Sequence, residues 1–478
     1  MTPADRATTL RVGGRGPAVP VRMRRVAVVV PDTSLREALV LLAEMGSVEI
    51  DTPGPGAGGQ GPAARRLQRL RTAPGRAALS ARLPGLDALE AVGRTDLLAG
   101  EARLEQLAEG AVRRGSVAAL VGWCPASRVE ETAGGLAPAG AALVGLAAPK
   151  GVDPPTALRA AGPLRRSFRY VVGGYGTVAY TDLDPTVPAG LAFIAMFGMM
   201  FGDAGHGIVL VVCALLLRLG VPRKAAVLRP LWPFLAGAGA AATLAGLAYG
   251  EFFGPTGVLP VLWLSPVEDP VRLLFAAVVT GAVLLLATSL AATVNRWRGS
   301  GPAGALYAPT GVAGTAVLVG LPALAAGLWL GPALLTAVGG VLLGGGLLLA
   351  GAGLYAQSAG GAAGTAETGV RLLDLVMRTF SNLVSFARLA AFGLTHAALG
   401  ALIWDGTTAL GGRGAPGLVA AAALFAVGNA VAFALEALVA GVQALRLEYY
   451  ELFSRLFDGQ GRPFSPWRLP VDRSEVVS

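Results

Sequence analysis

The chain has 478 residues, of which 54% are hydrophobic and only 14% are charged. With a mean hydropathy of +0.60, these values fit a polytopic membrane protein better than a soluble one. The net charge of +9 is consistent with an Arg-rich surface beside anionic lipid. No basic motif interleaved with aromatic residues indicates a nucleic acid partner. Cys124 and Cys213 fall in parts of different character and have no metal-ligand spacing, so we expect neither a disulfide nor a bound metal.

The character of the sequence changes near Asp184, because charged residues are frequent before it and sparse after it. We therefore predict a soluble N-terminal domain over residues 1–185 and a membrane domain over residues 186–478. The N-terminus lacks an apolar core of the signal-peptide type, so we expect the first domain to stay in the cytoplasm.

The soluble half contains two similar patterns. Residues 24–51 predict strand, helix, strand, with Asp32 or Ser34 as the N-cap and Gly46 ending the helix. Residues 117–146 repeat that order, so the two repeats are expected to complete one antiparallel sheet in a small α/β lobe. The intervening residues 64–114 predict a short helical hairpin.

Eight apolar segments follow, and a transmembrane helix needs roughly 20 such residues. They are 187–201, 203–218, 230–252, 271–294, 309–330, 333–356, 375–404 and 416–445. Gly202–Asp203 breaks the first pair, which is long for one span and short for two. We predict about eight transmembrane helices, the first two forming a tight or hinged hairpin. The Gly-rich run 338–353 suits close helix packing.

Charge supports the count of eight, because cytoplasmic loops carry Lys and Arg. With the N-terminus inside, eight spans place the basic cluster 218–229 inside and the acidic loop 253–270 outside. The C-terminal tail, which contains four arginines, then returns to the cytoplasm. Seven spans would put the 218–229 cluster outside.

Polar residues interrupt the last two apolar segments. Ser385, Arg388 and His396 share one helical face, as do Asn429, Glu436 and Gln443, with Arg446 three residues further on. Charges at membrane depth cost at least a few kcal/mol, so Arg388 needs a partner. Two facing polar stripes favour a hydrated ion pathway, in which His396 could relay protons. The alternative is a buried polar clamp that fixes helix packing.

The membrane half resembles the large membrane subunit of V-type and A-type rotary ATPases, called subunit a or subunit I. Four motifs carry the resemblance: DPTVPAGLAFIAMFGMMFGDAGHG (184–207), YGEFFG (249–254), SFARLAAFGLTHAAL (385–399) and LEALVAGVQALRLEYYELFSRLFDGQGRPFSP (435–466). The GWCP turn at 122–125 is also similar to this family. The resemblance implies a plasma-membrane stator subunit whose last two helices are long, tilted and packed against a rotating proteolipid ring.

In that family, Arg388 would match the essential arginine that faces the buried carboxylate of the ring, and Arg446 would match a second arginine. An arginine there favours the ionised carboxylate and blocks leakage between two ion half-channels. The remaining polar positions are assigned to lining or relay roles: Glu436, His396, Gln443, Ser385 and Asn429. Gln443 stands where several relatives have histidine. Asp203, His206 and Glu251 are motif residues with a structural role.

The resemblance implies several partners: a proteolipid c/K ring, peripheral stalk subunits, central stalk and catalytic subunits, and the lipid bilayer. We expect no cofactor and no catalytic residue, since the chain has no G-x-x-x-x-G-K-[ST] phosphate loop. The transported ion is H⁺ or Na⁺, with the proton expected. The short hairpin implies a shortened stator arm, so a stand-alone proton-coupled transporter and a purely structural membrane protein remain alternatives.

Overall fold

The computed structural model describes residues 20–51, 61–70, 76–149, 151–158, 162–456 and 461–473. The chain divides into two compact units, which are described separately here. The first comprises Met1–Arg159 with Gly461–Ser478, and the second comprises Ala160–Gln460. The boundary at 185/186 from composition refers to the edge of the membrane and stays a prediction.

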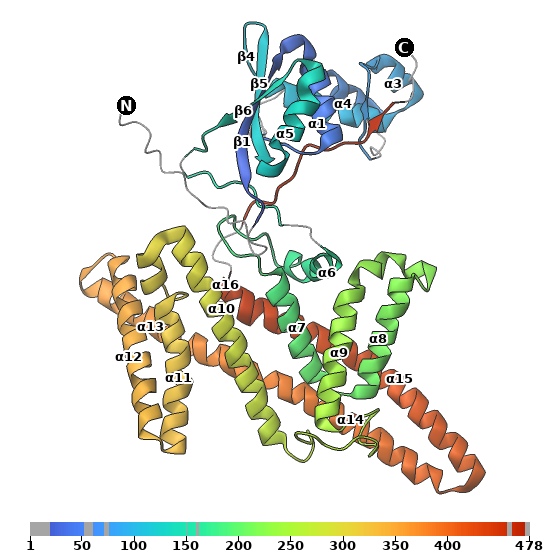
Figure 1. The fold of residues 1–478 in the computed structure, drawn as a ribbon, viewed down its shortest axis with the longest axis vertical. Helices are drawn as coiled ribbons and strands as arrows, with labels where there is room; N and C mark the ends of the chain where they lie inside the picture. The colour runs from blue at the N-terminus through green and yellow to red at the C-terminus, as the bar shows by residue number, and fades with distance from the viewer. Residues whose placement is uncertain are drawn as a thin grey trace. The chain divides into compact units, whose positions relative to one another are not determined.

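An antiparallel sheet forms the centre of the first unit, in the strand order β2-β5-β1-β6 with β4 on the edge of β5 (Figure 1). The long strands β1 and β5 pair from Met23 opposite Pro125 to Pro31 opposite Val117. The two predicted strand–helix–strand repeats are therefore present and share one sheet. The strands of this sheet are β1 (Met23–Pro31), β2 (Glu49–Ile50), β4 (Val112–Arg114), β5 (Val117–Pro125) and β6 (Ala142–Leu146).

The first helix, α1 (Leu35–Met45), has the predicted boundaries. Ser34 occupies the N-cap without a side-chain hydrogen bond, and Gly46 ends the helix in the left-handed conformation at a φ of 52°. Glycine suits this position because it has no Cβ to clash there. The apolar face of α1 and that of α5 (Val129–Leu136) contribute to the unit's core, in which Leu39, Leu42 and Leu136 are fully buried.

Three helices fill the segment between the repeats: α2 (Pro62–Arg69), α3 (Leu86–Val92) and α4 (Thr95–Glu109). Both α2 and α3 pack against α4. The predicted helical segment does not continue to residue 114, because β4 pairs with β5 from Val112 to Arg114.

The C-terminal residues 461–473 belong to the first unit. The short strand β7 (Val471–Asp472) pairs in parallel with β3 (Leu79–Ser80), and the indole of Trp467 donates a 2.8 Å hydrogen bond to the carbonyl of Leu39. Arg94 bonds both Asp96 and Asp472, and its hydrogen bond lowers the pKa of the Asp96 carboxyl. The first unit is thus built from both ends of the chain.

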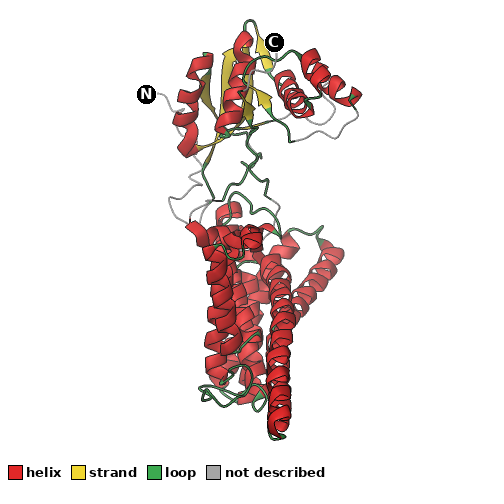
Figure 2. Ribbon diagram, turned by 90° about the vertical axis from the view of Figure 1, so that its right-hand side faces the viewer, coloured by secondary structure: helices red, strands yellow, loops and turns green. Residues whose placement is uncertain are grey.

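The second unit consists of helices, and Figure 2 shows strands only in the first unit among the described residues. Its helices are α6 (Gly162–Gly173), α7 (Thr186–Met200), α8 (Ala204–Leu219), η4 (Arg223–Leu231), α9 (Trp232–Tyr249), α10 (Pro270–Tyr307), α11 (Val312–Leu330), α12 (Ala333–Ala356), α13 (Gly361–Ser385), α14 (Ala387–Gly411), α15 (Gly414–Leu447), η5 (Glu448–Phe453) and α16 (Ser454–Leu456). A π-helix, η5, connects α15 to α16.

Six helical segments within the described residues are long and apolar enough to cross a membrane. The predicted count of eight is not confirmed, because α7 and α8 have only 15 and 16 residues. At a rise of 1.5 Å per residue they extend about 23 and 24 Å, short of a hydrocarbon core of about 30 Å. The predicted break between them is present, and both helices pack against α9.

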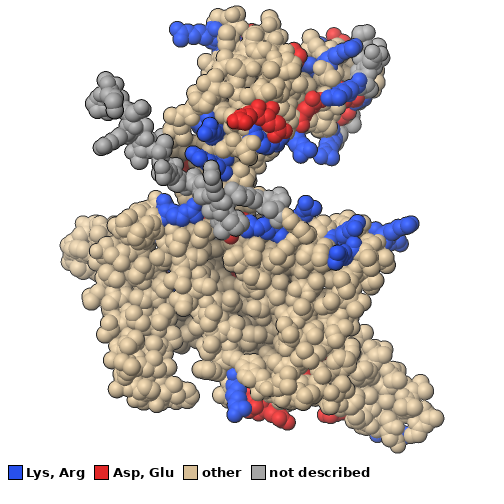
Figure 3. Space-filling view, in the orientation of Figure 1, with Lys and Arg blue, Asp and Glu red and all other residues tan. Residues whose placement is uncertain are grey.

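On the face of the second unit that Figure 3 shows, a broad belt is uncharged. Lys and Arg gather along one edge of this belt, whereas both signs of charge occur along the other edge. In Figure 1 the α8–α9 connection, with its basic residues Arg223, Lys224 and Arg229, lies at the first edge. Such a belt with basic residues at one edge is the surface expected of a protein embedded in a bilayer.

Glycines bring α11 and α12 into close contact. A Cβ on Gly339 would lie 2.3 Å from the backbone nitrogen of Leu324, and one on Gly320 would lie 2.4 Å from that of Leu343. The predicted role of the Gly-rich run in close packing is therefore confirmed.

Candidate functional site

Some of the polar residues predicted for the last two spans, among them Arg388, His396 and Glu436, contact other polar side chains near the packing of α14 against α15. Phe386 separates α13 from α14, so that Ser385 is the last residue of α13 and Arg388 lies in the first turn of α14. The polar side chains form two groups along α14. We call them the arginine cluster (Ser385, Arg388 and Glu451) and the histidine cluster (Asp203, His206, His396 and Glu436).

In the arginine cluster, Arg388 has a partner within its own chain. Its Nη2 donates to Glu451 Oε1 at 3.2 Å and to the hydroxyl of Ser385, which in turn bonds Glu451. The Glu451 side chain is only 8% exposed. From the sequence we expected Arg388 to pair with a carboxylate of another chain. In the structure, Arg388 pairs with Glu451, which lies in η5 of the same chain.

Arg388 is not enclosed by this contact. Its side chain is 25% exposed, and its Nη1 has no hydrogen-bond partner among the described residues. A groove of about 540 Å³ opens beside it, lined by Phe380, Ser381, Val384, Ser385, Ala387, Arg388 and Ala391. The side chain of Arg388 therefore contacts Glu451 and also lines the groove, while its Nη1 is buried and unpaired among the described residues.

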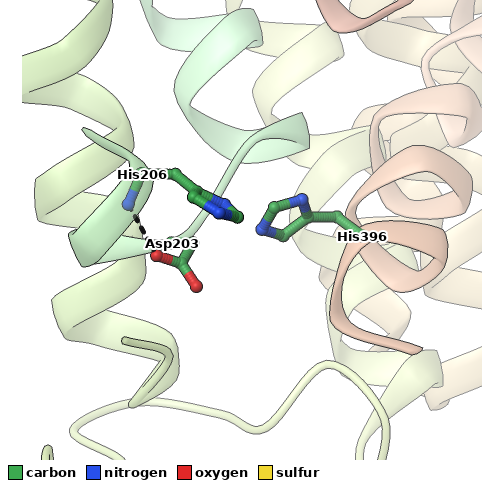
Figure 4. A group of neighbouring side chains, drawn as sticks. All are labelled: Asp203, His206 and His396. Atoms are coloured by element: carbon green, nitrogen blue, oxygen red, sulfur yellow. Dashed lines mark hydrogen bonds between the residues drawn. The ribbon is translucent and has the colours of Figure 1, made fainter. Parts of the chain in front are cut away.

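In the histidine cluster, α7–α8 and α14–α15 meet. His396 Nδ1 bonds the carboxylate of Glu436 on α15, and the ring of His396 lies 5.6 Å from that of His206 on α8, centroid to centroid. Figure 4 shows Asp203, His206 and His396 converging on one point. Their ligand atoms all lie within 4.8 Å of one another, so these three side chains could hold a metal ion.

Asp203 also has a structural role. It is the N-cap of α8, and its carboxylate accepts hydrogen bonds from the backbone N–H groups of His206, Phe253 and Gly254 at 2.8–3.0 Å. Two of these donors come from the YGEFFG segment. Asp203 thus connects two motifs that are 50 residues apart in the sequence.

Aromatic rings surround the two histidines. The ring centroids of Phe201, Phe253 and Phe433 lie 5.3–5.7 Å from that of His206. Phe201 also lies 5.2 Å from the ring centroid of His396. His206 and His396 are 4% and 6% exposed. The histidine cluster is therefore a polar group in a largely apolar surrounding, where electrostatic interactions are strong.

The other predicted site residues lie outside these direct contacts. Asn429 is buried and donates to the carbonyl of Phe425, and Gln443 has a buried side-chain oxygen without a hydrogen-bond partner. Arg446 is exposed on α15 and makes no ion pair with any described residue. Glu251 is buried next to Phe253, and its backbone carbonyl accepts from Ala204.

Glu448 and Glu451 were not identified from the sequence. Glu451 lies eight residues after Gln443, a spacing that keeps it close to the face of the predicted polar stripe, so a signal was present. Glu448 is fully buried, and neither of its carboxylate oxygens has a hydrogen-bond partner among the described residues. Both residues lie in η5, and such π-helical turns are frequent at functional sites.

The two clusters are eight residues apart on α14, which corresponds to about 12 Å along the helix. The histidine cluster contains two imidazoles, the side-chain type whose ordinary pKa lies nearest to neutral pH. The arginine cluster contains a charge that is permanent. A titratable group and a fixed positive charge at different depths of one helix pair suit the movement of a cation across the membrane.

Comparison with known proteins gives consistent matches. A sequence model of the V-type ATPase 116 kDa subunit family matches residues 113–226. A-type ATP synthase subunit I of Aeropyrum pernix is 27% identical over 360 residues, covering 65% of this chain and 51% of the relative. The subunit I of Halobacterium salinarum is 27% identical over 66% of this chain and 51% of its own length. The V-type proton ATPase subunit a, vacuolar isoform, of Saccharomyces cerevisiae is 33% identical over 114 residues, which are 23% of this chain and 14% of the yeast protein. The chain thus spans about half the length of the archaeal relatives that it matches.

Proposed function

This chain belongs to the V/A-type ATPase subunit a/I family and is a multi-pass membrane protein, and from that premise we propose that it is the ion-translocating stator subunit of a rotary ATPase. The observation that supports this role best is Arg388, a permanent charge on a membrane helix that faces a groove. The ring of proteolipid subunits would pass along this groove.

Arg388 would exchange partners during turnover. Between encounters, Glu451 and Ser385 hold the guanidinium, as in the contacts described above. A ring carboxylate entering the groove would compete with Glu451 for Arg388, because the arginine stabilises the ionised form of either group. The entering carboxylate would then release its ion, and the fixed charge would prevent ions from passing directly between the two half-channels.

The histidine cluster would form part of one half-channel. His396 and Glu436 share a hydrogen bond and can pass a proton between imidazole and carboxylate. Asn429, Gln443 and Arg446 on α15 would line the path or help to orient groups of the ring. Ser385 and Glu451 would belong to the other half-channel, beside Arg388.

The orientation proposed from charge places the N-terminal unit and the C-terminus in the cytoplasm. The basic α8–α9 connection would then be cytoplasmic, and the acidic loop before α10 would be outside. Stalk and catalytic subunits would attach through the N-terminal unit. Within the described residues, the helices of its segment between the repeats are the short α2, α3 and α4, which supports a shortened stator arm.

Substitution of the two arginines tests this function. In membrane vesicles that contain the assembled complex, Arg388→Ala should abolish ATP-driven ion uptake because the ring carboxylate loses the permanent counter-charge in the groove. Arg446→Ala should reduce uptake without abolishing it, since its exposed side chain holds no buried carboxylate in place. Ion uptake would be followed with a pH-sensitive dye, and assembly by the amount of complex recovered.

Arg413→Ala is a matched control, since Arg413 lies outside α14 and α15 at the connection between them. It should leave uptake unchanged. If ATP-driven ion uptake persists in Arg388→Ala, the role in translocation that we propose for Arg388 is wrong. If the purified chain carries no proteolipid and no catalytic subunits, the protein is a separate transporter or a structural protein.

A further inference from the structure

We propose that Asp203, His206 and His396 form a binding site for a divalent transition-metal ion, with Zn²⁺ as the best-matched ion. The site lies inside the helical unit, where the N-terminus of α8 faces α14. The proposal that the metal ion binds here rests only on the donor atoms of these three side chains. The effect of the ion on translocation rests in addition on the function proposed above.

The three donors already lie near one another. Their ligand atoms are all within 4.8 Å, and the three residues are 0%, 4% and 6% exposed. Zinc binds imidazole nitrogens and carboxylate oxygens at about 2.0–2.2 Å, so ligands of one ion lie about 3.3 Å apart. Side-chain movements on the order of 1 Å would close the site around the ion.

His206 is the strongest indication of a ligand. Both of its ring nitrogens are buried, and within the described part of the chain neither forms a hydrogen bond of normal geometry, although the side chain of Asn429 lies close enough to interact with the imidazole. A buried polar group without a partner destabilises the fold, because the group loses its hydrogen bonds to water. A metal ion bound to one ring nitrogen would remove part of this cost.

His396 has the arrangement that metal-binding histidines usually have. Its Nδ1–H donates to the carboxylate of Glu436, which fixes the tautomer and leaves the lone pair of Nε2 free. Figure 4 shows one ring nitrogen of His396 directed toward His206 and Asp203. Glu436 would orient the ligand and increase its basicity, as carboxylates around zinc sites commonly do.

Asp203 retains capacity for a metal after its structural hydrogen bonds are counted. Its Oδ1 accepts from two backbone N–H groups, which uses both lone pairs. Its Oδ2 accepts from the N–H of Gly254 only, so one lone pair of Oδ2 remains. Three backbone donors hold this carboxylate rigidly, which preorganises the site.

The charge around the site favours a cation. Asp203, Glu251 and Glu436 contribute three carboxyl groups, and none of them pairs with a Lys or Arg among the described residues. Glu251 and Glu436 each have a buried oxygen without a hydrogen-bond partner, so either carboxylate, or a water molecule, could complete the coordination. Two nitrogens and one oxygen suit Zn²⁺ or Co²⁺, whereas Mg²⁺ and Ca²⁺ prefer oxygen ligands alone.

A bound ion would connect α8 to α14 and occupy Nε2 of His396. If His396 relays protons as proposed above, the ion would stop the relay, and Zn²⁺ would inhibit translocation. The aromatic rings of Phe201, Phe253 and Phe433 would limit access of water to the ion.

The experiment measures metal binding directly and does not depend on transport. The full chain would be purified in detergent, as part of its complex if it assembles, with an affinity tag that contains no histidine. Co²⁺ would be added, followed by displacement with Zn²⁺. We expect one Co²⁺ per chain, with the visible absorption of a four-coordinate site. His206 and His396 are the only two histidines of the chain, so His206→Gln and His396→Gln should each weaken binding at least about tenfold.

Cys213→Ser is the matched control, because Cys213 is the exposed thiol of α8 and the other plausible ligand on that helix. It should leave binding unchanged. Should the histidine variants not fold, X-ray absorption of the zinc-loaded wild-type chain decides the question. Fewer than two imidazoles in the zinc shell, or binding lost with Cys213→Ser, would overturn the site. Binding without inhibition of ion uptake would keep the site and contradict the proposed relay instead.

Discussion

Asp203 shows how one side chain can define a local fold. It caps α8 and also holds the YGEFFG turn, in which Phe253 adopts a positive φ of 51°. Such a conformation is uncommon for residues other than glycine and needs support from its surroundings. The sequence identified both motifs, but their connection through one carboxylate became visible only in the fold.

Replacing Asp203 should therefore destabilise the helical unit. Asp203→Ala removes the acceptor of three backbone N–H groups, which should cost about 2–4 kcal/mol from the cap and the buried donors together. Asp203→Asn keeps one acceptor oxygen and should cost less. Thermal unfolding in detergent measures both variants, and Asp405→Ala, at an exposed position of α14, is the control. Equal stability of Asp203→Ala and wild type would contradict the structural role.

For Arg388, the sequence indicates that a partner is needed but does not identify the partner. Its need for a counter-charge follows from the sequence, because guanidinium cannot lose its proton in a bilayer. The identity of the partner does not follow from the sequence, since Glu451 is 63 residues away and belongs to another helix. Periodicity places residues on a face of one helix, whereas pairing depends on how two helices pack.

The close contact between α11 and α12 depends on glycine. Gly339 faces the backbone of α11, but its neighbour Gly340 has nothing within 4 Å of an added Cβ. The two positions therefore form a matched pair for mutation, with the same residue type in the same helix.

Gly339→Ala should lower the free energy of unfolding by about 1–3 kcal/mol, because the added methyl group forces the two backbones apart. Gly340→Ala should be neutral or slightly stabilising, since alanine favours the helix. Thermal unfolding of the detergent-solubilised chain would compare the two. If both variants lose equal stability, the tight contact of α11 with α12 is not as described.

For the whole molecule, the number of membrane crossings depends on the two short helices α7 and α8. Among the described residues, six segments are long enough to span, while the charge pattern favoured eight. The short helices α7 and α8 differ from the others because they pack on α9 and against the histidine cluster. A helix enclosed by protein can be shorter than the bilayer, which fits the largely buried α7. In contrast, α8 keeps apolar side chains such as Val212 and Leu219 exposed.

Cysteine labelling of intact cells would test the orientation. In a Cys213→Ser background, Glu268→Cys should react with a membrane-impermeant maleimide from outside, because the acidic loop before α10 is proposed to be external. Lys224→Cys should react only after the membrane is opened. Both positions are exposed, so accessibility in the protein does not limit the reaction. Labelling of Lys224→Cys in intact cells would reverse the proposed orientation.

The membrane character, the two strand–helix–strand repeats and the resemblance to the V/A-type ATPase subunit could all be predicted from the sequence. They follow from composition, periodicity and motifs, which depend on neighbours in the sequence. The fold was needed to reveal that Glu451 pairs with Arg388, that Asp203, His206 and His396 converge, and that residues 461–473 complete the first unit. The physical reason is that these contacts join segments distant in sequence, and packing rather than local preference brings such segments together.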